Sequence, residues 1–216
     1  ETAERLLGYC CNAGPSFFFG ILAVYFPEWW MCWSLWGLHI LGAIAAAWVI
    51  PSGQFPCASK QSSSPEKSVP EVLLTALGIM ANVSGWLLLF RVLIAFLERW
   101  FFWRFPISVR VFLSGFLELA NGCSILDLIL DIRLRFVLCS VMMSMGGLCV
   151  FLQTKSVSEG LSLQWYVLGK FIQASVSGLI AAACLYKTVV PLYLLLFLLP
   201  FLAKQKKRGS IRAVAD

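Results

Sequence analysis

Long apolar runs separated by short polar or basic segments are the feature that most constrains how this chain can fold. A membrane-spanning helix needs about 20 predominantly apolar residues, because in lipid its backbone must satisfy its own hydrogen bonds. The run from Trp29 to Ile50 meets this requirement without a formal charge, and it begins with several tryptophans. Tryptophan is enriched where a membrane meets water. The sequence therefore predicts an all-α, polytopic integral membrane protein.

Composition supports the same class. Of 216 residues, 60% are hydrophobic and 13% are charged, whereas a soluble domain averages about 45–50% apolar and roughly 25% charged. A soluble fold of this length could not bury so much apolar surface. The composition excludes an ordinary soluble enzyme, a disordered chain and a nucleic-acid-binding protein.

Polar segments divide the chain into four parts. Residues 1–50 contain a broken helix, interrupted at Gly14-Pro15, and then the Trp29–Ile50 run. Residues 51–68 form a polar linker rich in serine and proline, which is typical of exposed loops. Residues 69–203 form a larger membrane domain, and residues 204–216 form a basic tail.

The tail accounts for much of the net charge of +6. Its basic residues are Lys204, Lys206, Lys207, Arg208 and Arg212. We interpret it as a cytoplasmic tail, either held against anionic lipid headgroups or simply solvated.

Within residues 69–203 several apolar helices are predicted. They span Val69–Leu97, Phe136–Gln153, Trp165–Tyr186 and Val189–Ala203. The first should be interrupted at Asn82, Ser84 and Gly85, and the second loosened at Gly146-Gly147. The small residues Ala174, Gly178 and Ala182 recur at every fourth position, which lets a neighbouring helix approach closely.

Residues 111–130 are apolar but contain several polar groups. Because an Asn-Gly pair favours a turn, we predict two half-helices that form a re-entrant hairpin turning at Asn121-Gly122. Glu118 lies in this hairpin, and an ionisable group within a membrane costs at least about 2.5–3.5 kcal/mol. Glu118 and Asn121 are therefore candidates for binding a cation, a proton or a substrate hydroxyl. The alternative is a structural ion pair between Glu118 and Arg91 or Lys170.

Two further polar interruptions share a spacing. Asn12, Gly14, Pro15 and Phe19 align with Ser144, Gly146, Gly147 and Phe151. Paired interruptions of this kind are typical of the internal repeats of transporters. The candidate substrate or ion ligands are Glu118, Asn121, Asn12, Ser16, Ser144, Gly146, Gly147 and Gln153.

The cysteines, His39 and Asn82 are interpreted as structural residues. Of eight cysteines, only Cys57 lies in a polar segment, and no Cys/His spacing typical of a metal site occurs. We expect buried free thiols, no cofactor, no metal and no catalytic residues. His39 is interpreted as a hydrogen-bonded interior histidine, and Asn82-Val83-Ser84 as a helix-packing feature despite fitting a glycosylation sequon.

Three segments carry a family resemblance. They are ERLLGYCCNAGPSFFFGIL, FLSGFLELANGCSIL and MSMGGLCVFLQT. In this order they resemble the sporulation integral membrane protein YlbJ family, whose members carry a nucleoside-recognition or Gate domain. The resemblance covers about Glu4 to Ala182 and implies a Gate-like domain over residues 69–203. Because family members are longer, it also implies that this chain is a C-terminal portion.

By this resemblance the protein is expected in a bacterial cell membrane and in endospore formation. The first functional hypothesis is a transporter- or permease-like protein that moves an unidentified small solute or ion. The second is a scaffold that organises spore-envelope proteins through the linker and the basic tail. A membrane-embedded enzyme is the weakest hypothesis, because no nucleophile–base pair or metal set is visible.

Overall fold

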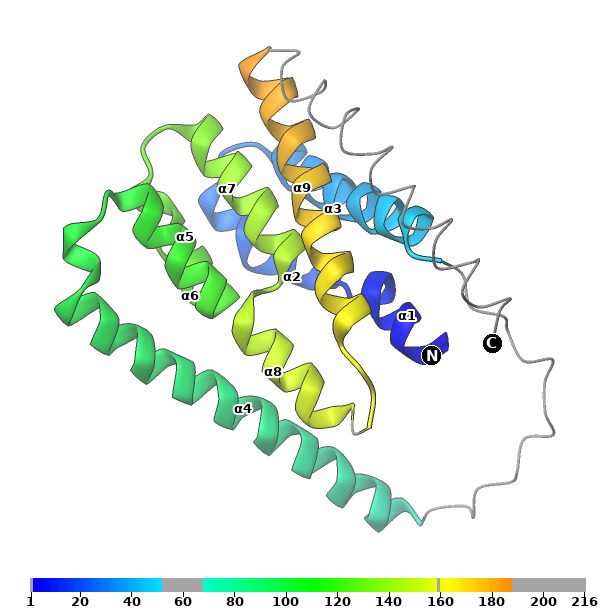
Figure 1. The fold of residues 1–216 in the computed structure, drawn as a ribbon. Coiled ribbons are helices and arrows are strands. Elements are labelled where there is room, and N and C mark those ends of the chain that lie inside the picture. The colour runs from blue at the N-terminus through cyan, green and yellow to red at the C-terminus, as the bar shows by residue number, and fades with distance from the viewer. Residues whose placement is uncertain (1, 52–67, 159, 188–216) are drawn as a thin grey trace.

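The structure, a computed structural model, describes residues 2–51, 68–158 and 160–187 (Figure 1). These residues form helices and no strand. In chain order the elements are α1 (Thr2–Cys10), α2 (Pro15–Gly20), η1 (Leu22–Tyr25), α3 (Trp29–Val49), α4 (Val69–Trp100), η2 (Phe102–Arg104), α5 (Ile107–Leu117), α6 (Leu119–Ser124), η3 (Leu126–Leu128), α7 (Ile132–Met145), α8 (Gly147–Val157) and α9 (Gln164–Tyr186). Most of the predicted linker, the predicted helix over residues 189–203 and the basic tail lie outside the described residues.

Within the described part, four helical stretches are long and apolar enough to cross a membrane. They are α3, α4, the α7–α8 stretch Ile132–Val157, and α9. The prediction of an all-helical chain with membrane-spanning segments is confirmed to this extent. Three of the predicted helices agree closely with α3, α9 and the stretch that α7 and α8 share.

Helix α9 lies at the centre of the packing, with α7, α3 and α1 against it (Figure 1). Glycines allow these close approaches. A Cβ atom at Gly169 would collide with the main chain of Gly8 in α1. One at Gly178 would lie 2.5 Å from Val141 in α7. Gly178 belongs to the predicted row of small residues, and it lets a neighbouring helix approach closely as expected.

Two helix breaks occur where the sequence predicts them. Helix α1 ends at Cys10, and α2 starts at Pro15 with Gly14 as its extended N-cap residue. Proline suits the first position of a helix because it lacks the N–H that would have no partner there. Between α7 and α8, Gly146 and Gly147 have φ angles of +80° and +83°, a left-handed conformation that glycine adopts most easily.

Two local predictions are wrong. Helix α4 runs without interruption through Asn82, Ser84 and Gly85. One interior glycine costs about 1 kcal/mol relative to alanine, which is too little to break a 32-residue helix. The Asn82 side chain also has a partner, since its Nδ2 donates to Ser156 Oγ at 3.0 Å.

The hairpin reverses at Glu118 and not at Asn121-Gly122. Both residues of that pair lie inside α6, and Gly122 packs directly against Gly115 of α5. Gly122 therefore serves the close contact of the two short helices. The reversal occurs at Glu118 because its extended backbone ends α5 and its carboxylate caps α6.

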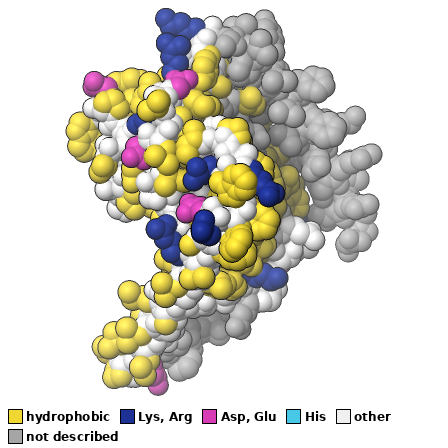
Figure 2. Space-filling model, turned by 90° about the vertical axis from the view of Figure 1, so that its left-hand side faces the viewer, with side chains coloured by type: hydrophobic (Ala, Val, Ile, Leu, Met, Phe, Trp, Pro, Cys, Tyr) yellow, Lys and Arg dark blue, Asp and Glu magenta, His cyan; other side chains and the backbone are white. Residues whose placement is uncertain are grey.

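Helix α4 lies along one edge of the molecule with little protein around it (Figure 1). Only Phe90 and Ile94 of this helix are buried, although its sequence is strongly apolar. Figure 2 shows a neighbouring face on which hydrophobic side chains dominate and basic side chains gather near the middle. An exposed apolar surface of this extent is suited to lipid.

The Gly8–Gly169 contact predicts a selective loss of stability. Gly169→Ala should lower the free energy of unfolding by about 1–3 kcal/mol, the usual cost of overpacking. Gly37→Ala is the matched control, because a Cβ there meets nothing within 4 Å, and it should leave stability unchanged or raise it slightly. Thermal unfolding in detergent, followed by tryptophan fluorescence, measures both. Equal stability of the two variants would contradict the contact.

Candidate functional site

Three helix breaks meet at one cavity, with a volume of about 330 Å³. The α1–α2 break, the Glu118 reversal and the α7–α8 break each contribute lining residues, and α4, α8 and α9 complete the walls. The lining residues include Cys11, Asn12, Ala13, Phe17, Val83, Leu87, Glu118, Leu119, Ala120, Met143, Gly146, Val150, Gln153, Tyr166 and Lys170. Segments far apart in the sequence therefore form a single candidate site.

Glu118 holds one wall of this cavity in place. Its carboxylate accepts hydrogen bonds from the main-chain N–H groups of Ala120 at 2.9 Å and Asn121 at 2.7 Å. A carboxylate at a helix N-terminus interacts favourably with the partial positive charge there. Within the described residues, Glu118 forms no ion pair with Arg91 or Lys170. The alternative prediction of a structural ion pair is therefore wrong.

Lys170 brings a positive charge to another wall of the cavity. It is 6% exposed and stands on α9 in the middle of the packed helices. Its ammonium donates to Asn12 Oδ1 at 3.3 Å and to Gln173 Oε1 at 2.9 Å. Gln173 in turn donates to Asn12 Oδ1 at 2.9 Å. These three side chains fix the α1–α2 break against α9.

The same network continues away from the cavity. Gln173 Nε2 also donates to the main-chain oxygen of His39 at 3.0 Å. One turn further along α9, Ser177 donates to the main-chain oxygen of Leu38 at 2.9 Å and accepts from Ser144 Oγ at 2.9 Å. His39 is buried at 1% exposure, within hydrogen-bond reach of Gln173. The prediction of an interior, hydrogen-bonded histidine is confirmed.

The structure brings only some of the predicted ligands together. Asn12, Glu118, Gly146 and Gln153 line the cavity. Gln153 also donates weakly to the main-chain oxygen of Val83, at 3.4 Å, so it links α8 to α4.

The other predicted ligands have different places. Ser16 is exposed and lies outside the cavity lining. Ser144 donates a hydrogen bond to Ser177. Gly147 packs so closely against α5 that a Cβ atom on it would lie 3.0 Å from the main-chain oxygen of Gly115. Asn121 is buried inside α6, and its Nδ2 has no hydrogen-bond partner.

Tyr166 and Lys170 are site residues absent from the predicted ligands. Tyr166, Lys170, Gln173 and Ser177 follow the spacing of one helical face. Residues three and four apart lie on the same side of a helix, and polar groups in an apolar helix face the protein interior. This periodicity of α9 was the signal that could have identified them.

The cysteines follow the prediction only in part. Cys32, Cys123, Cys139 and Cys149 are buried free thiols. Cys10 and Cys184 are exposed, so the expectation of burial is wrong for these two. A free cysteine behaves as a small hydrophobic residue, so it can also lie on an apolar outer surface. In the described ranges, no three His, Cys, Asp or Glu side chains group together as metal ligands would.

No protein-family profile matches this chain, and no curated protein or solved structure is significantly similar to it. The resemblance to the YlbJ family therefore stays a prediction.

The Gln173 network gives a second prediction of stability. Gln173→Leu should lower the free energy of unfolding by about 1–3 kcal/mol, because it leaves buried partners on Asn12, Lys170 and His39 unsatisfied. The control is Gln164→Leu, the same change at an exposed position of the same helix. Thermal unfolding of the purified protein compares the two. A fully stable Gln173→Leu variant would show that the network contributes little.

Proposed function

We propose that this protein is a multi-pass protein of a bacterial cell membrane that moves a small solute or ion and takes part in endospore formation. The observation that carries the transport proposal is the meeting of three helix breaks at one cavity. Transporters commonly build their sites from interrupted helices near the middle of the membrane. The cavity volume of about 330 Å³ also lies in the usual range for small-molecule sites.

The chemistry of the lining supports a solute site over simple helix packing. A carboxylate from Glu118, an ammonium from Lys170 and amide groups from Asn12 and Gln153 face one space. Ionisable groups in apolar helices are costly and usually mark solute or ion pathways. The sporulation role rests on the family resemblance alone. The scaffold hypothesis rests on the linker and the tail, which fall almost entirely outside the described residues.

Accessibility of the cavity to water tests transport without knowledge of the solute. Ala120→Cys, in the full chain with its native cysteines replaced, should react with a membrane-impermeant methanethiosulfonate from both sides of the membrane. A site with alternating access is exposed to each side in turn. Leu88→Cys is the control, because Leu88 lies on the outer surface of α4 at 68% exposure and should not react.

Two outcomes would contradict the transport proposal. An unreactive Ala120→Cys would mean that the interior is closed, as a scaffold requires. Reaction from one side only would indicate a binding pocket that does not communicate across the membrane.

Spore yield tests the biological role. Glu118→Gln, introduced into the protein in its spore-forming host, should reduce spore yield at least tenfold while membrane levels stay normal. Glu28→Gln is the matched control, because Glu28 also precedes a helix but is exposed and makes no capping bond. Glu118→Asp retains the carboxylate and should restore part of the yield. Normal spores from Glu118→Gln would exclude a role for this carboxylate in spore formation.

A further inference from the structure

We infer that the cavity binds an anionic group of its solute, a carboxylate or a phosphate, through the Lys170 ammonium and the Tyr166 hydroxyl. This inference deepens the proposed function, since it names the class of solute for the same site.

The surroundings of Lys170 leave its charge without a counter-ion. Its two hydrogen-bond acceptors, Asn12 Oδ1 and Gln173 Oε1, are neutral amide oxygens. No carboxylate within the described ranges forms an ion pair with it. An ammonium has three N–H donors, so one remains for a ligand. Burying an unpaired charge is costly, and an anion in the adjoining cavity offsets this cost.

Tyr166 supplies a second, independent donor. Its side chain is 2% exposed, and its hydroxyl makes no hydrogen bond of good geometry, although the Thr154 side chain lies near it. It lies one turn before Lys170 on α9, with the ammonium 5.9 Å from the centre of its ring. Buried hydroxyl groups in folded proteins nearly always have a partner. A ligand oxygen held between Tyr166 and Lys170 would provide one.

One further wall favours the same charge. Gly146 lines the cavity and is the N-cap residue of α8, which has no side-chain cap. The N-terminus of a helix attracts negative charge. Glu118 does not neutralise Lys170, because its carboxylate caps α6. Its remaining lone pairs can accept from a hydroxyl or amine elsewhere on the same solute.

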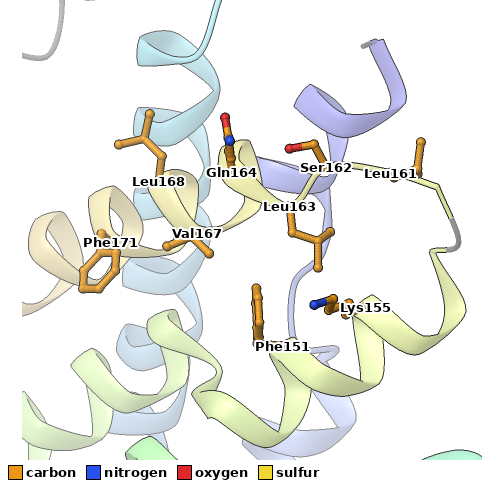
Figure 3. Close-up of a pocket in the computed structure, with 9 residues that line it drawn as sticks. All are labelled: Phe151, Lys155, Leu161, Ser162, Leu163, Gln164, Val167, Leu168 and Phe171. Atoms are coloured by element: carbon orange, nitrogen blue, oxygen red, sulfur yellow. The ribbon is translucent and has the colours of Figure 1, made fainter.

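A row of two further cavities lies beside this site, between α8 and α9. An outer groove of about 670 Å³ is lined by Phe151, Val167 and Phe171, with Lys155 on its wall. Figure 3 shows Phe151 and Lys155 on α8 opposite Leu163 and Val167. A smaller cavity of about 180 Å³ shares Phe151, Val167 and Phe171 with this groove, and shares Tyr166 and Lys170 with the central cavity.

The row places Lys155 and Lys170 along one series of neighbouring cavities. Its apolar walls also suit an apolar part of the solute. The anionic group could thus belong to a soluble molecule or to a lipid, and the experiment separates these sources.

The test measures thermal stabilisation of the purified full chain in detergent, since a ligand that binds the folded state raises the unfolding midpoint. The probes are acetate, inorganic phosphate and dihexanoyl phosphatidic acid, each titrated at constant ionic strength. Stabilisation by acetate or phosphate alone identifies a soluble anion, and stabilisation by phosphatidic acid alone identifies a lipid. Either result supports the inference, provided that it depends on Lys170.

Variants establish this dependence. Lys170→Met should weaken the apparent affinity for the active probe at least tenfold, whereas Lys187→Met, which removes the same charge at the exposed end of α9, should not change it. Tyr166→Phe removes only a hydroxyl that makes no protein hydrogen bond of good geometry, so it should fold normally and bind about three- to tenfold more weakly. This variant decides the question if Lys170→Met does not fold.

The inference is overturned if none of the probes stabilises the protein, or if Lys170→Met and Tyr166→Phe bind as the unchanged chain does. Its failure is distinguishable from failure of the transport proposal. Labelling of Ala120→Cys from both sides without anion binding overturns the anion site alone. Anion binding through Lys170 with labelling from one side only overturns transport alone.

Discussion

In an apolar environment, every polar group exposed by a helix interruption must find its partner within the protein. This constraint connects the three breaks of the chain. At the first, Asn12 donates to the main-chain oxygen of Tyr9 at 2.6 Å and accepts from Gln173. At the second, Glu118 receives the first N–H groups of α6. The Asn12 bonds also hold the first break against α9, and the three breaks line one cavity.

Helix α9 meets two requirements with one sequence. Gly169 and Gly178 let α1 and α7 approach closely, while Lys170, Gln173 and Ser177 supply the polar contacts. Small residues and hydrogen-bonding groups are the two main means by which helices associate in membranes. Their interleaving on α9 places a charged side chain at the centre of the molecule without leaving it to lipid.

Much of the fold could be predicted because its signals are local. An apolar run such as Trp29–Ile50 defines a helix by itself, and the Gly14-Pro15 and Gly146-Gly147 pairs mark breaks through their own backbone preferences. The reversal at Glu118 could not be located in the same way. It depends on Gly122 packing against Gly115, a contact that exists only after α6 has folded back. The position of Tyr166 in the cavity wall likewise depends on which face of α9 packs against the helix breaks.

The nearly bare surface of α4 has a consequence for the cavity. This helix contributes Val83 and Leu87 to the cavity wall but buries only two residues of its own. With 32 residues it is ~48 Å long at about 1.5 Å per residue, well above the hydrocarbon thickness of about 30 Å. A helix that is longer than the hydrocarbon layer can fit within it by tilting. In a membrane, the thickness of the surrounding lipid would therefore help to set the dimensions of the cavity.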